Sequence, residues 1–142
     1  MKISTKGRYA LRIMADLGIN AGEHCCSVRE ISERQGISEK YLEQIFSLLS
    51  RAGYVTSIRG AGGGYRLTKK PKDYTVGMIL RTAEGSLAPV ACLIDGEPGC
   101  ERADSCTTLF LWQKIYKAVN DVVDEITLQD LIDNQLKVEG KA

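Results

Sequence analysis

Three cysteines lie in the second half of the chain, in a stretch that shows neither helical nor strand periodicity. They are separated by seven and five residues, and glycines and a proline lie among them: Cys92, Gly96, Pro98, Gly99, Cys100 and Cys106. A loop of this kind can bring three soft thiolates onto one iron-sulfur cluster. The spacing lacks the paired C-x-x-C knuckles of structural zinc sites, which disfavours zinc. From the residues alone, three plain thiols are the preferred interpretation.

The other two cysteines stand beside the single histidine of the chain, as His24, Cys25 and Cys26. Five cysteines are an odd number, which in a reducing compartment argues against a disulfide framework. The three neighbours could together bind a metal ion. A loop histidine with adjacent cysteines is more often a packing or surface feature, and we favour that interpretation.

A second group of residues has the chemistry needed to bind DNA. Reading a major groove requires a rigid helix whose first turns carry polar side chains, backed by cations that contact phosphates. Residues 38–44 meet this requirement around apolar anchors at Leu42 and Ile45. Gln44 can pair with adenine and Glu43 can accept from cytosine, although Glu43 could equally be a solvated helix charge. The side chains suited to phosphates are Ser38, Lys40 and Tyr41.

A glycine-rich stretch, Gly60-Ala-Gly-Gly-Gly64, follows Arg59 and precedes further basic residues at Arg66, Lys69 and Lys70. An arginine at this place could enter a minor groove while the backbone at Gly60 and Gly62 approaches the phosphates. No Gly-Lys-Ser/Thr sequence follows, so the stretch is not a P-loop. A loose hairpin turn is the alternative.

The surrounding pattern predicts the elements that position these groups. Apolar spacing and stop signals predict helices over residues 5–20, 27–35 and 38–53. Ser27 and Glu30 form a capping box, and Gly36 breaks the second helix. Two helices joined by a short turn containing glycine are typical of a helix-turn-helix, and the residues around the glycine run predict a β-hairpin.

The second half of the chain is predicted to contain a short helix capped by Thr75, the cysteine loop, and a long helix over 108–125. The long helix has one apolar stripe, made of Trp112, Ile115, Val119, Val122 and Ile126. Such a stripe outside a compact lobe usually needs a partner. A final short helix begins at Thr127.

Composition places the chain among ordinary globular proteins, with 44% hydrophobic and 26% charged residues in 142. Residues 1–73 hold 13 Lys and Arg against 7 Asp and Glu, a net charge of +6, whereas residues 74–142 hold 6 against 11, a net charge of −5. The basic half is expected to meet a polyanion. We predict a DNA-binding region at 1–74 and a cysteine-loop and dimerisation region at 75–142, with no membrane segment and a cytoplasmic location.

Several motifs together carry a resemblance that covers nearly the whole chain. They are Lys6-Gly-Arg-Tyr9, Ile31-Ser-Glu-Arg-Gln-Gly-Ile-Ser38, Tyr41-Leu-Glu-Gln44, Arg59-Gly-Ala-Gly-Gly-Gly-Tyr65, Leu111-Trp112 and Thr127-Leu128. In this respect the chain resembles the IscR-type iron-sulfur cluster regulators. The resemblance implies a mainly α fold with a small β-hairpin, a winged helix-turn-helix followed by a long dimerisation helix. It also implies a homodimer that binds double-stranded DNA at a pseudo-palindromic operator.

The resemblance also implies roles for particular residues. Glu43, Gln44 and Arg59 match the DNA-contacting positions of that family, and Ser38, Lys40 and Tyr41 fall on its contact surface. The three cysteines of the loop, Cys92, Cys100 and Cys106, would hold a 2Fe-2S cluster.

The chain departs from the family pattern around the cluster. The gap between the first two cysteines is longer than in the best-known members, and the family's histidine ligand falls on Leu109. The positions near the N-terminus that serve some relatives are Arg8 and Arg12, which are not ordinary ligands. The fourth ligand stays open among Glu101, Asp104, Thr107, Thr108 and a group from the other subunit.

These observations predict a DNA-binding transcription regulator controlled by a 2Fe-2S cluster. The alternative is a cluster-free winged-helix regulator that senses a partner protein or thiol oxidation through the same cysteines. An enzyme is disfavoured because the chain has no nucleotide motif, no convincing nucleophile-base pair and a single histidine.

Overall fold

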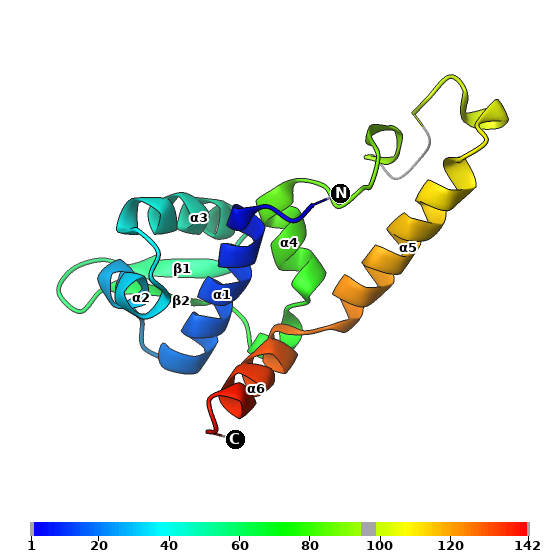
Figure 1. Ribbon diagram of the computed structural model, residues 1–142. Helices are drawn as coiled ribbons and strands as arrows, with labels where there is room; N and C mark the ends of the chain where they lie inside the picture. Colours follow the sequence, from blue (N-terminus) through cyan, green and yellow to red (C-terminus); the bar gives the residue numbers. More distant parts are fainter. Residues whose placement is uncertain (1, 95–98, 142) are drawn as a thin grey trace.

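The computed structural model describes residues 2–94 and 99–141, so Gly96 and Pro98 of the predicted loop lie outside the described residues. The chain folds into helices and one two-stranded antiparallel hairpin (Figure 1). The elements are α1 (Thr5–Asn20), α2 (Val28–Gln35), α3 (Glu39–Arg51), β1 (Val55–Ile58), β2 (Gly64–Leu67), α4 (Val76–Glu84), α5 (Leu109–Glu125) and α6 (Leu128–Val138). Short 3-10 turns span Pro71–Asp73, Ala91–Leu93 and Ala103–Ser105.

The helix-turn-helix begins and ends at the residues that local chemistry predicts. Ser27 Oγ accepts from the Glu30 amide at 3.1 Å, and the Glu30 carboxylate accepts from the Ser27 amide at 3.3 Å. Gly36 ends α2 in the left-handed conformation at φ 66°, which costs a glycine little. Ser38 Oγ then accepts from the Tyr41 amide at 3.2 Å and starts α3. The predicted capping box and turn are confirmed.

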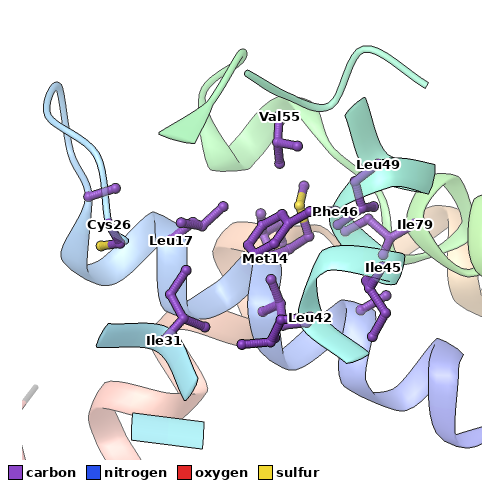
Figure 2. Close-up of a cluster of buried hydrophobic side chains, with 14 of the residues drawn as sticks. Met14, Leu17, Cys26, Ile31, Leu42, Ile45, Phe46, Leu49, Val55 and Ile79 are labelled. Atoms are coloured by element: carbon purple, nitrogen blue, oxygen red, sulfur yellow. The ribbon is translucent and has the colours of Figure 1, made fainter. Parts of the chain in front are cut away.

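The main hydrophobic core lies between α1, α3 and the hairpin (Figure 2). Met14 and Leu17 of α1 meet Leu42 and Phe46 of α3, and all four side chains are fully buried. The Phe46 ring stacks on Tyr65 of β2 with centroids 4.0 Å apart. Buried contacts therefore hold α3 and the hairpin in one fixed relation.

The hairpin is extended by the segment before α2. Cys26 and Tyr65 exchange both backbone hydrogen bonds, at 2.9 and 2.8 Å, so Cys26 continues the sheet beyond β2. Gly64 lies directly over the Cys26 carbonyl, where any Cβ atom would collide with backbone. This close approach explains why glycine is needed at position 64.

The base of the hairpin is fixed by the buried phenol of Tyr74. Its oxygen accepts from the Thr68 and Lys69 amides at 3.1 and 3.0 Å and donates to the Tyr54 carbonyl at 2.7 Å. One side chain thus joins both ends of the hairpin to the segment that enters α4.

The second half of the chain packs back onto the first. α4 lies against α1, and α6 inserts Leu128 into the main core. α5 contacts α4 through a smaller buried cluster that includes Leu80 and Val123. Arg81 of α4 also donates to Asp124 of α5 at 2.7 Å. Apolar packing and an ion pair therefore hold these two helices together.

None of the five residues of the predicted apolar stripe on α5 is fully buried in the single chain, as expected of a stripe that needs a partner. Val123, which is outside the predicted stripe, is the residue that α5 buries against α4. Val122 and Ile126 of the predicted stripe are 55% and 37% exposed. Long-range packing against α4 decides which face is covered, and periodicity alone does not show it. Over the described residues, no helix combines the length and the apolar character that crossing a membrane requires.

Candidate nucleic-acid interface and cysteine segment

The first turns of α3 have a polar face toward solvent and an apolar face toward the core. Lys40, Glu43 and Gln44 are exposed, and the latter two lie three and four residues after Lys40, on one helix face. Leu42 and Ile45 are buried. The fold therefore presents three of the predicted contact residues together to solvent.

The other two predicted residues at the start of this helix are already engaged. Ser38 uses its hydroxyl oxygen to cap α3, and Tyr41 packs edge-on against Tyr9 of α1 with ring centroids 5.7 Å apart. Ser47 lies one turn beyond Glu43 and Gln44 on the same exposed face, and its hydroxyl oxygen accepts from Arg51 Nη2 at 3.3 Å.

The wing tip places Arg59, Gly60 and Gly62 in solvent between β1 and β2. Gly60 and Gly62 have φ values of 98° and 76°, a conformation that disfavours side chains. The Cys25 thiol donates to the Gly62 carbonyl at 3.1 Å and so ties the tip to the segment before α2. No local pattern predicts this contact, because the two residues lie 37 positions apart.

Replacing Arg59 with alanine is expected to weaken binding to all duplexes and to lower the salt dependence by about one released counterion. Glu43→Ala is expected instead to change base preference, by about 1–3 kcal/mol at one position. Fluorescence anisotropy over a salt series, with selected and scrambled duplexes, separates the two effects. Lys117→Ala on α5 is the charge-matched control, and an equal loss in that variant would contradict the assignment.

The cysteine segment, residues 85–108, connects α4 to α5. Cys92 is half-buried beside the fully buried Leu93, whereas Cys100 and Cys106 are exposed. The Gly99 amide donates to the Cys92 carbonyl at 2.8 Å, which draws the first and second cysteine positions together. No three potential ligands are gathered into a ready metal site within the described residues.

The three cysteine sulfur atoms are nevertheless suitable ligands for a soft metal centre. The Arg102 amide donates to Cys100 Sγ at 3.4 Å, and the Thr108 hydroxyl lies 3.6 Å from Cys106 Sγ. Hydrogen bonds from the Thr108 side chain and from the Thr108 and Leu109 amides lower the pKa of the Cys106 thiol. Cys106 is thus held closer to the thiolate, the form of cysteine that binds iron.

The lowered pKa of Cys106 predicts a measurable pH dependence in cluster-free protein. Its alkylation by iodoacetamide is expected to reach half its maximal rate below the ordinary thiol value of about 8.5, because the thiolate persists to lower pH. Peptide mass spectrometry of the fragment containing Cys106 measures the profile. Thr108→Val should move the midpoint upward, and identical midpoints in the two proteins would refute the role of Thr108.

The four residues of this segment that could supply a fourth ligand are all accessible. Glu101, Asp104, Thr107 and Thr108 are exposed, and of these the Thr108 hydroxyl has the recorded contact with a cysteine sulfur. The fourth ligand stays a prediction.

The cysteines beside His24 have packing contacts. Cys26 is 2% exposed in the main core, and burial raises the pKa of its thiol. Cys25 contacts the wing tip as described. Both cysteines therefore connect the segment before α2 to the hairpin.

A helix-turn-helix, a β-hairpin wing packed on its second helix, and a polar face on that helix together define a winged-helix protein of the DNA-binding class. Residues 3–134 match the profile of the Rrf2 family, described as an iron-dependent transcriptional regulator. The chain belongs to this family, and its relatives include the IscR-type regulators.

Two comparisons with named relatives extend over almost the full chain. The HTH-type transcriptional regulator IscR of Aliivibrio salmonicida is 42% identical over 138 residues, covering 96% of this chain and 81% of that protein. IscR of Escherichia coli O139:H28 is 39% identical over 143 residues, covering 99% and 87%.

Two solved structures have the same fold. The structure of CymR, described as the global cysteine regulator of B. subtilis, shares 46% identity with a TM-score of 0.76 and covers 94% of this chain and 98% of that one. The structure of T. potens IscR shares 40% identity with a TM-score of 0.78 and covers 97% and 90%.

Proposed function

We propose that this transcription regulator binds its operator under the control of a 2Fe-2S cluster held by Cys92, Cys100 and Cys106. The observation that carries the proposal is the position of the cysteine segment. It joins α4, which packs on α1 of the DNA-binding half, to α5, which is tied to α4 by Arg81 and Asp124. A change in this segment therefore acts directly on helices that support the DNA-binding half.

The DNA partner is double-stranded and the operator pseudo-palindromic. Apolar side chains on α5 support a homodimer, because Phe110, Leu111 and Val122 are 63%, 40% and 55% exposed. Pairing of two α5 helices removes these surfaces from water. Two α3 helices related by a two-fold axis then enter successive major grooves about 34 Å apart.

The residues of the segment act by holding sulfur atoms in place. The Gly99 amide fixes the loop at the Cys92 carbonyl, the Arg102 amide contacts the Cys100 sulfur, and the donors around Cys106 favour its thiolate. Cys92, Cys100 and Cys106 would hold the cluster, which when bound would supply iron chemistry that is sensitive to oxidants and to iron demand. With the segment ordered or released, the relative position of α4 and α5 shifts, and the spacing of the two α3 helices changes with it.

The first test is an anaerobic visible absorption spectrum of freshly purified protein, with iron and sulfide assayed on the same sample. Charge-transfer bands with equal iron and sulfide support the cluster. Operator affinity is then compared between loaded and cluster-free protein at matched salt. Equal affinities would rule out cluster control, and a colourless protein that resists reconstitution would rule out the cluster.

A second function, thiol sensing without a cluster, is favoured by one observation. Cys106 is exposed and its pKa is lowered, which increases the fraction of the reactive thiolate form. Under this function, protein that contains no iron changes its operator affinity after treatment with peroxide, and a reductant restores it.

A further inference from the structure

The end of α4 is joined to the start of α1 by one carboxylate. Glu84 Oε1 accepts from the Ser4 amide at 2.9 Å and from the Ser4 hydroxyl at 2.6 Å, across 80 residues of sequence. Ser4 is the N-cap of α1, and its hydroxyl oxygen also accepts from the Gly7 amide at 3.2 Å. Glu84 therefore belongs to the cap of a helix in the other half of the chain.

Gly7 provides the space for this contact. A Cβ atom at position 7 would collide with Glu84 Oε1, and its next neighbour is the Ile3 side chain at 3.1 Å. Gly7 is buried within helical backbone, where glycine is otherwise unfavourable. The close approach of the carboxylate supplies the physical reason for a glycine there.

The contact lies between the cysteine segment and α3. Glu84 is the last residue of α4, and the chain continues from it into the segment that contains Cys92. At the other end, Tyr9 of α1 packs against Tyr41 in the first turn of α3. Figure 1 shows the N-terminal segment, which leads into α1, beside the end of α4.

We propose that Glu84 is a positioning residue for operator binding, which transmits the state of the cysteine segment to the start of α1 and hence to α3. The inference rests on the proposed function. A displacement of residue 85 moves the last turn of α4, and with it the Glu84 carboxylate that is hydrogen-bonded to Ser4. The hydrogen bonds to Ser4 carry this displacement to the first turn of α1, which directly precedes Tyr9, the packing partner of Tyr41.

The contact itself is tested by a double-mutant cycle on thermal stability. Gly7→Ala is expected to lower Tm in the wild-type background because its methyl group displaces the carboxylate. In a Glu84→Ala background the same change is expected to leave Tm unchanged or raise it, because the space is empty and alanine favours a helix. An equal loss of Tm in both backgrounds would overturn the contact.

The transmission is tested by the ratio of operator affinities between loaded and cluster-free protein. Wild-type protein is expected to show a ratio on the order of ten, within the usual range of coupling between sites. Glu84→Ala is expected to bring the ratio to about one, whereas Glu84→Gln, which keeps an acceptor oxygen, should retain most of it. Glu139→Ala, beyond the end of α6, is the control and should keep the wild-type ratio.

The outcomes separate this inference from the proposed function. A wild-type ratio of one removes cluster control and the role of Glu84 together. A wild-type ratio near ten that persists in Glu84→Ala overturns the role of Glu84 alone and assigns the coupling to another route. If Glu84→Ala does not fold, Ser4→Ala, which removes the hydroxyl donor, is measured in its place and is expected to lower the ratio.

Discussion

Alanine at any one of Cys92, Cys100 and Cys106 is expected to abolish cluster binding. Each substitution leaves two thiolates in the segment, and water or an oxygen side chain is a poor substitute for the missing sulfur. Soft thiolate ligands are what hold an iron-sulfur cluster in a protein, so the loss is expected to be complete within detection. The measurement is visible absorption together with iron and sulfide per chain after anaerobic reconstitution.

Cys25→Ala is the matched control for these variants. It removes a thiol outside the segment and should retain the full cluster, although it frees the wing tip at Gly62. Thermal unfolding of each variant shows that the fold survives. A full cluster in any of the three segment variants would remove that cysteine from the ligand set, and a lost cluster in Cys25→Ala would place a ligand beside the wing.

Arg34→Ala is expected to destabilise the fold by about 3 kcal/mol, the cost of leaving a buried charge without its partner. The Asp16 side chain is 2% exposed, and Arg34 donates to it at 2.7 Å from Nη2 and at 3.0 Å from Nε. Gln35 also donates to Asp16, at 2.8 Å. Because this hydrogen bond remains in Arg34→Ala, the loss of stability is expected at the lower end of the range for a broken buried ion pair. The hydrogen bond to Asp16 raises the pKa of Arg34, so the guanidinium stays charged at every working pH.

Asp16→Ala is expected to cost less than Arg34→Ala, because the Arg34 side chain is 35% exposed and water can solvate it. Urea denaturation at pH 7 measures both changes. Arg29→Ala provides the control, since its pair with Glu33 lies in solvent and should contribute less than about 1 kcal/mol. A larger loss for Asp16→Ala than for Arg34→Ala would contradict the burial argument.

Loss of this ion pair is also expected to weaken DNA binding. Asp16 lies on α1 and Arg34 on α2, so their contact fixes the first helix of the helix-turn-helix against a helix that contributes to the main core. A variant that folds without the pair is expected to hold α3 less firmly. Operator affinity of Arg34→Ala, measured at a temperature below its unfolding midpoint, tests this consequence of the same prediction.

The helices, the turn and the hairpin could be predicted from the sequence because their signals are local. The predicted first helix over 5–20 agrees with α1, and the capping box at Ser27 and the break at Gly36 are both present. Caps, turn glycines and apolar periodicity act over a few residues, and each contributes to one backbone conformation whatever lies elsewhere. The exposed face of α3 could be predicted for the same reason.

The sequence by itself thus determined the winged-helix plan and its family, and it supplied the candidate residues for DNA and for iron. Only the tertiary structure decided which distant groups meet: Cys25 at the wing tip, Glu84 at the cap of α1, Arg34 on Asp16, and Val123 as the covered side of α5. The hydrogen bonds among these contacts join residues between 18 and 80 positions apart. Their pairing depends on how whole elements pack, because side-chain chemistry alone does not distinguish one distant partner from another.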